Sequence, residues 1–190
     1  MRDLVYYVAS SLDGFIAGPE GEFDFFPFEG GLKAYVTSTY PETLPTPYRA
    51  AVGLDVPNAR FDTAIMGRGT YEPGLREGFT SPYAHLRQYV FSRTLPAAPD
   101  PEVTVLADDP LPFVRELKRQ EGQDIWLCGG GTLAAELLPE IDELCVKLNP
   151  VVVGAGIPLF TRSFEPWRFT ITETRPFDTG VVLLRYRRTS

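Results

Sequence analysis

The sequence is poor in the residues that most often carry hydrolytic or metal chemistry. Among 190 residues there is one histidine, His85, and there are two cysteines, Cys128 and Cys145. A Ser-His-Asp triad needs a histidine as its base, and a zinc site needs several cysteines or histidines at ligand spacing. His85 lies in a polar stretch between Pro82 and Arg87, where we expect a surface residue. The sequence therefore argues against common hydrolase chemistry and offers no metal-ligand set.

Basic charge and long hydrophobic runs are also scarce. The formal net charge is −7, whereas nucleic acids and anionic membranes favour a basic protein face. No apolar run approaches the roughly 20 residues that span a bilayer, and Met1–Leu4 leads straight into a strand pattern without a secretory signal. Both cysteines lie in apolar segments and are expected to be buried free thiols. We therefore expect a cytoplasmic protein with a small-molecule partner and no nucleic-acid or membrane partner.

Short apolar runs alternate with helical patterns along the chain. A helix is expected from the N-cap Asp109 to Gly122, and a second one from the glycines at 129–131 to Pro139. Residues 10–30 predict a long irregular loop, and prolines interrupt residues 31–61. Strands are expected at 4–9, 63–66, 88–91, 103–106, 125–128 and 144–149, with a C-terminal hairpin formed by 169–172 and 181–184. This order predicts a three-layer α/β (αβα) fold in one domain over residues 1–190, with a mainly parallel mixed sheet and an antiparallel C-terminal hairpin.

Glycines and basic residues follow three of the expected strands. Gly129-Gly130-Gly131 ends one strand and opens a helix, so that backbone N–H groups could face an anion. This spacing matches neither the Rossmann fingerprint nor the P-loop, and a simple tight turn would explain it equally well. The segment 67–70 and the pair Ser92-Arg93 end two further strands. Because ligands of open α/β sheets bind at the carboxyl ends of strands, the three ends together predict one phosphate-bearing ligand.

Four segments carry a family resemblance: Ser11–Gly18, Met66–Glu72, Trp126–Thr132 and Leu144–Phe160. In this order and spacing they resemble the dihydrofolate reductase-like superfamily. The resemblance is greatest to the family of the C-terminal reductase domain of the bifunctional riboflavin-pathway deaminase/reductase, and it spans most of the chain. It implies a dihydrofolate reductase-like fold, an NADPH-dependent reductase of a small pyrimidine- or pterin-like heterocycle, and a homodimer.

The resemblance also implies which residues bind NADPH. The nicotinamide would lie near the end of the first strand and the loop after it, at Val8, Ala9, Ile16 and Ala17. The pyrophosphate would meet two helix starts, formed by Gly67, Arg68, Gly69 and Thr70 and by Gly130, Gly131, Thr132 and Leu133. Arg68, Ser92 and Arg93 would bind the adenosine 2′-phosphate. The family's cis peptide bond would fall at Gly129-Gly130.

Three carboxylates are candidates for the catalytic acid: Asp13, Asp24 and Glu29. An ungapped count from Asp13 brings Glu29 into register with the carboxylate that holds the pteridine in dihydrofolate reductases, although the following Gly30-Gly31 pair is a poor helix former. Asp24 precedes an aromatic residue in the same loop, and for both residues the alternative is a solvated loop acid. Asp13 precedes a glycine, so a structural turn is the alternative to contact with the substrate or the nicotinamide edge.

The function stays open among related alternatives. One is dihydrofolate reductase itself, and another is an NADPH-binding protein without catalysis. The riboflavin-pathway substrate carries a ribose phosphate, which calls for a further basic cluster, and the sequence offers only Arg49 and Arg60 for it.

Overall fold

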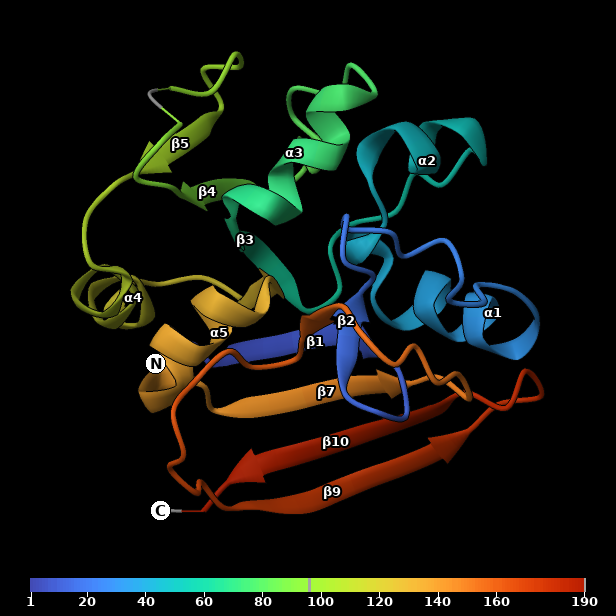
Figure 1. The fold of residues 1–190 in the computed structure, drawn as a ribbon. Coiled ribbons are helices and arrows are strands. Elements are labelled where there is room, and N and C mark those ends of the chain that lie inside the picture. Colours follow the sequence, from blue (N-terminus) through green and yellow to red (C-terminus); the bar gives the residue numbers. More distant parts are fainter. Residues whose placement is uncertain (96, 190) are drawn as a thin grey trace.

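One mixed sheet runs through strands from both ends of the chain. In this computed structural model, which describes residues 1–95 and 97–189, the eight strands have the order β5-β4-β3-β6-β1-β7-β10-β9 (Figure 1). Their bounds are β1 Leu4–Ser10, β3 Phe61–Gly67, β4 Arg87–Phe91, β5 Val103–Leu106, β6 Asp124–Gly129, β7 Glu143–Leu148, β9 Phe169–Pro176 and β10 Val182–Arg188. The strands from β5 to β7 are parallel, and β10 runs antiparallel to both β7 and β9. The predicted mixed sheet with an antiparallel C-terminal hairpin is confirmed.

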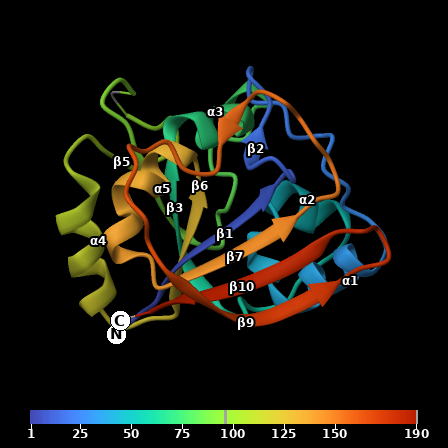
Figure 2. The ribbon, with the colours of Figure 1, turned by 60° about the horizontal axis from the view of Figure 1, so that its bottom comes forward.

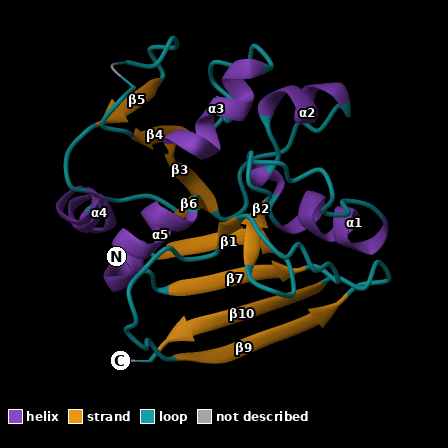
Figure 3. Ribbon diagram, viewed as in Figure 1, coloured by secondary structure: helices purple, strands orange, loops and turns teal. Residues whose placement is uncertain are grey.

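Helices cover both faces of this sheet and complete the three predicted layers (Figures 1 and 3). One face carries α1 (Gly30–Thr39), α2 (Thr46–Ala51) and α3 (Arg68–Arg76), with a 3-10 turn at Pro41–Thr43. The other face carries α4 (Pro110–Arg119) and α5 (Gly131–Leu137), followed by a 3-10 turn at Leu138–Glu140. Figure 2 shows the two groups of helices on opposite sides of the twisted strands. None of the helices in the described part of the chain combines the length and the apolarity needed to cross a bilayer.

The alternation of side chains along β1 builds both halves of the core. Tyr6 is fully buried in the cluster that contains Leu137 of α5, whereas Tyr7 lies in the opposite cluster with Tyr40 and Phe61. A central strand covered on both faces is apolar at consecutive positions, because each neighbour in sequence faces a different layer. This is why β1 could be recognised from its sequence alone.

A short ribbon crosses the loop that the sequence predicted to be irregular. Strand β2 (Phe15–Ala17) pairs antiparallel with β8 (Ile157–Pro158). A Cβ atom at Gly156 would overlap with the backbone oxygen of Ala17, so only glycine allows the two segments to approach this closely. The ribbon therefore joins the loop after β1 to the loop after β7.

Helix α1 begins at Gly30, although the sequence made this pair of glycines an unfavourable helix start. Asp178, from the turn between β9 and β10, accepts a hydrogen bond from the backbone N–H of Gly31 at 3.0 Å. A Cβ atom on Gly30, whose φ is +54°, would lie 2.8 Å from Asp178 Oδ2. The helix start is thus stabilised by a side chain that is remote in sequence, and glycine leaves the space for it.

Two local expectations were wrong. Helix α4 has the predicted N-cap, since Asp109 accepts from Leu111 N at 2.9 Å, but it ends at Arg119, before the expected cap at Gly122. His85 is half-buried rather than on the surface. Its Nδ1 lies 3.0 Å from Thr46 Oγ1, and its Nε2 lies 2.8 Å from the backbone oxygen of Glu42. Both partners are remote in sequence from the polar stretch that suggested exposure, so local sequence could not reveal them.

Candidate active site

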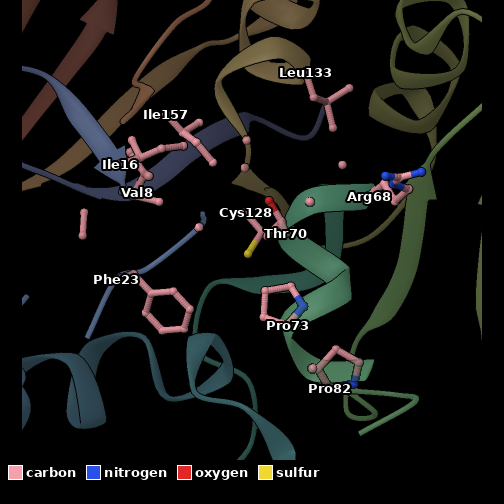
Figure 4. Close-up of a pocket in the computed structure, with 18 of the residues that line it drawn as sticks. Val8, Ile16, Phe23, Arg68, Thr70, Pro73, Pro82, Cys128, Leu133 and Ile157 are labelled. Carbon is pink, nitrogen blue, oxygen red and sulfur yellow. The ribbon is translucent and has the colours of Figure 1, made fainter. Parts of the chain in front are cut away.

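The carboxyl ends of the central parallel strands open onto one large cleft. Its volume is about 1230 Å³, which exceeds the roughly 300–1,000 Å³ of an ordinary small-molecule pocket. Figure 4 shows Arg68 at one end, Val8 and Ile16 at the other, and Thr70 and Cys128 between them. The cleft therefore extends from the starts of α3 and α5 to the loop after β1.

All the residues that the resemblance assigned to the cofactor line this cleft. They are Val8, Ala9, Ile16, Ala17, Gly67, Arg68, Gly69, Thr70, Ser92, Arg93, Gly129, Gly130, Gly131, Thr132 and Leu133. The sheet order explains why residues so far apart in sequence meet: β4, β3, β6 and β1 are consecutive parallel strands, so their carboxyl ends share one edge.

Two helix starts lie side by side in the cleft. Helix α3 follows Gly67 and helix α5 follows Gly130, and neither N-cap residue has a side chain that bonds to the first N–H groups. A Cβ atom on Gly67 would lie 3.7 Å from the backbone nitrogen of Gly130. The peptide bond between Gly129 and Gly130 is cis. Uncapped N–H groups of two helices thus lie side by side, as an anion-binding site requires.

Basic and hydroxyl groups gather at the β4 end of the cleft. Arg68 donates from Nη1 to Thr94 Oγ1 at 2.6 Å, and its Nε lies 3.0 Å from Glu72 Oε1. Ser92 Oγ accepts a hydrogen bond from the backbone N–H of Thr94 at 3.2 Å, so its O–H proton stays available for donation. Arg93 is exposed beside it. This cluster can bind a phosphate monoester by charge-assisted hydrogen bonds.

Asp13 does not line the cleft. Its carboxylate accepts hydrogen bonds from the backbone N–H groups of Val153, at 3.1 Å, and Gly154, at 2.7 Å. Ser11 Oγ donates to it at 2.6 Å, and this bond is the largest of the effects that lower the pKa of Asp13 to about 2. Asp13 therefore joins the loop after β1 to the loop after β7. This agrees with the structural role that the sequence analysis gave as the alternative to substrate contact.

The other two carboxylates differ in position. Asp24 is exposed and lines the cleft. Glu29 directly precedes α1, is exposed, and does not line the cleft. Instead α1 presents two buried apolar side chains, Leu32 and Val36, to the cleft. The ungapped count from Asp13 predicted that Glu29 holds the substrate. In the structure Glu29 lies just before the start of α1 and outside the cleft.

The end of the cleft opposite the arginines was missed by sequence reasoning. It is mainly apolar and aromatic, with a few polar groups: Phe23, Phe26, Phe28, Leu32, Val36, Leu44, Tyr48, Thr43, Tyr83, Cys128, Lys147 and Asn149. Cys128 was expected to be buried, but it is partly exposed to the cleft, and only Cys145 is fully buried. Burial raises the pKa of the Cys128 thiol to about 12, so the group stays protonated near neutral pH. These residues come from α1, α2, β6, β7, the 3-10 turn at Pro41–Thr43 and several loops, and no local motif marks them.

The two arginines considered for a second phosphate lie elsewhere. Arg60 pairs with Asp124 at 3.0 Å and with Glu143 at 2.8 Å. Arg49 donates to the backbone oxygen of Val56 at 2.6 Å. Neither residue lines the cleft. Both are used to hold the structure together, which leaves them unavailable to a ligand in the cleft.

Comparison with known proteins agrees with this arrangement. The family model of the RibD C-terminal domain matches residues 2–183. The uncharacterized protein YwjB of Bacillus subtilis (strain 168) is 33% identical over 186 residues, with 96% of each chain covered.

Solved structures share the fold at lower identity. A diaminohydroxyphosphoribosylaminopyrimidine deaminase/5-amino-6-(5-phosphoribosylamino)uracil reductase from Thermotoga maritima superposes with a TM-score of 0.66 at 16% identity, over 99% of this chain and 57% of that one. Dihydrofolate reductase from Enterococcus faecalis, in complex with NADP(H), superposes with a TM-score of 0.64 at 16% identity, over 99% and 97% of the two chains. The fold and the family resemblance inferred from the sequence are both confirmed. The chain belongs to the RibD C-terminal domain family and has the dihydrofolate reductase-like fold.

Proposed function

We propose that this protein is an NADPH-dependent reductase of a small pyrimidine- or pterin-like heterocycle. The observation that carries the proposal is the cleft itself: two uncapped helix starts lie next to Arg68, Ser92 and Arg93, and the same cleft continues to an apolar, aromatic end. One end suits a phosphate-rich cofactor, and the other suits a flat ring.

The residues present fit a dinucleotide. A Cβ atom on Gly69 would meet no heavy atom within 4 Å, so the glycine leaves open space at the start of α3. The helix starts at Gly67–Thr70 and Gly130–Leu133 would bind the pyrophosphate, and the arginines would bind the 2′-phosphate. Val8, Ala9, Ile16 and Ala17 would pack around the nicotinamide, which supplies the hydride when it is bound.

A preference for NADPH over NADH tests the cofactor half of the proposal. In the variant Arg68→Ala/Arg93→Ala, NADPH binding should weaken by roughly 100-fold, because each lost charge-assisted hydrogen bond costs about 1.5 kcal/mol or about tenfold. NADH binding should change little. The measurement is a fluorescence titration with each reduced cofactor. Arg76→Ala is the matched control, since Arg76 is exposed in the last turn of α3 and lies outside the cleft. Equal affinity of the unmodified protein for NADPH and NADH would overturn the proposal.

The substrate half needs a turnover assay. Oxidation of NADPH would be followed with a panel of pyrimidines, pterins and flavins, including dihydrofolate and the phosphoribosylaminouracil acceptor in the name of the Thermotoga relative. We expect an acceptor without a phosphate to react best, because Arg49 and Arg60 lie outside the cleft. Turnover of dihydrofolate alone would favour dihydrofolate reductase proper. Tight NADPH binding with no turnover across the panel would favour a non-catalytic NADPH-binding protein.

A further inference from the structure

Lys147 lines the mainly apolar end of the cleft. It belongs to β7 and pairs in parallel register with Ala9 of β1, which is one of the residues assigned to the nicotinamide. Residues opposite each other in neighbouring strands project from the same face of a sheet. On this face the sheet is covered by α1, whose Leu32 and Val36 line the same cleft as Lys147. The lysine therefore lies at the apolar end of the cleft, next to the expected position of the nicotinamide.

The ammonium group of Lys147 has no carboxylate partner among the described residues. Its Nζ lies 4.2 Å from the centre of the Tyr7 ring, which holds the cation by its π face. The other two lysines of the chain differ. Lys118 pairs with Asp142 at 2.7 Å, and Lys33 is exposed, 5.7 Å from the ring of Tyr48. Of the three lysines, Lys147 is the one that lines the cleft, and among the described residues its ammonium group has no carboxylate partner.

The groups around Lys147 stay neutral near physiological pH. Burial raises the pKa of Tyr7 well above its ordinary value, and it raises the pKa of Cys128 to about 12 and of Cys145 to about 11. Burial also raises the pKa of Tyr83 well above its ordinary value. Burial has the opposite effect on the lysine and lowers the pKa of Lys147 to about 8.

The carboxylates that line the cleft come from other elements, and all are exposed: Asp24, Glu77, Asp108 and Glu136. Of the groups that face Lys147, the lysine itself is therefore the one that gains and loses a proton near neutral pH. Its acidity suits proton transfer, because a general acid works best when its pKa lies near the working pH.

We propose that Lys147 binds the substrate and is the proton donor of the reaction, an inference that rests on the proposed reductase function. Its ammonium hydrogen-bonds the oxygen or nitrogen of a C=O or C=N bond in the ring. As the carbon of that bond receives hydride from the reduced nicotinamide, the π electrons move onto the heteroatom, which takes a proton from Nζ. The neutral lysine then regains a proton from water. The substrate class is a planar ring that offers a hydrogen-bond acceptor at the position of reduction.

Three variants separate this role from packing. Lys147→Met keeps an unbranched apolar stem over Tyr7 but removes the charge. Lys147→Arg keeps a cation that does not release a proton near neutral pH, so it should bind the ligand yet lose proton transfer. Lys33→Met is the matched control, because it removes a lysine that also lies over a tyrosine ring but outside the cleft. Thermal melting of each variant checks that it folds.

The first measurement is ligand binding to protein saturated with NADP⁺. The probe is 5-nitrouracil, a planar acceptor that is an anion at neutral pH, and 2,4-diaminopyrimidine serves as a donor-rich counterpart. We expect Lys147→Met to weaken binding of 5-nitrouracil by roughly tenfold or more, with no loss for 2,4-diaminopyrimidine. Lys147→Arg and Lys33→Met should bind both probes like the unmodified protein, and all variants should retain NADP⁺ affinity.

The second measurement follows the lysine directly. The chain has three lysines, so reductive ¹³C-methylation gives few NMR signals, and the one missing from Lys147→Met is assigned to Lys147. It should titrate with a midpoint near the expected pKa of about 8 and shift when 5-nitrouracil binds. Failure of the unmodified protein to bind 5-nitrouracil, or equal binding by Lys147→Met, would overturn the role of Lys147 while leaving NADP⁺ binding intact. Absence of NADP⁺ and NADPH binding would instead overturn the reductase function, and the proposal with it.

Discussion

Replacing Gly131 with alanine should strongly destabilise the protein. Gly131 is the first residue of α5, and β8 with its following loop passes directly over it. A Cβ atom at this position would overlap with the backbone oxygen of Pro158 and would lie 3.3 Å from that of Leu159. The same loop is bonded to the helix start, because Thr161 N–H donates to Gly131 O at 3.1 Å. Both of these neighbouring atoms belong to the backbone, so rotation of a side chain cannot relieve the clash.

The size of the effect follows from two opposing terms. Overpacking in a well-packed site costs about 1–3 kcal/mol, and more where backbone has to move. Alanine is favoured over glycine in a helix by at most about 1 kcal/mol. We therefore expect a net loss of about 2 kcal/mol or more in the free energy of unfolding, which is a large part of the roughly 5–15 kcal/mol that stabilises a typical domain.

Gly69→Ala is the matched control, because it introduces the same methyl group at the start of the other cleft helix. A Cβ atom at Gly69 would meet no heavy atom within 4 Å, so the unfolding free energy should stay unchanged or rise slightly. Guanidinium denaturation followed by the fluorescence of the two tryptophans measures both variants. An unchanged unfolding free energy in Gly131→Ala, or equal losses in both variants, would show that the close approach of β8 does not matter.

Three further predictions concern buried polar groups and assembly. Glu42 is fully buried and accepts hydrogen bonds from the backbone N–H groups of residues 59–61. Glu42→Ala should therefore lower the free energy of unfolding by about 3 kcal/mol or more in chemical denaturation, and Glu42→Gln should lower it less. Burial lowers the pKa of His85 below its ordinary 6.5. The unfolded chain therefore binds more protons, and stability should fall as pH drops below that value. In His85→Gln this part of the pH dependence should vanish between pH 7 and about 5. Light scattering should give the mass of a homodimer, for which edge strand β9 offers Ile171 with 49% of its surface exposed, and a monomer mass would contradict it.

The strands were predictable because burial on both faces leaves a local mark. Strand β6, for example, carries consecutive apolar residues that end in glycine, and its sequence needs no partner to be recognised. The ribbon of β2 and β8 carries no such mark, since its strands have three and two residues. The start of α1 was also beyond local reasoning, because the residue that stabilises it, Asp178, lies 147 positions away from Gly31.

The two halves of the candidate site also differ in how strongly the local sequence marks them. Its cofactor half is built from short segments at strand ends, such as Gly67–Thr70, where glycines and an arginine stand together in sequence. Its other half is built from single side chains on separate elements, among them Phe23, Leu32 and Lys147. Lys147 in particular alternates with apolar neighbours, as a solvent-facing residue of any half-buried strand does. Only the register of β7 against β1, and the helix α1 above that face, turn this ordinary pattern into a cation enclosed in a cleft. The proposed chemistry of the substrate therefore depends on the three-dimensional surroundings of Lys147, whereas the proposal of NADPH starts from segments that can be found in the sequence.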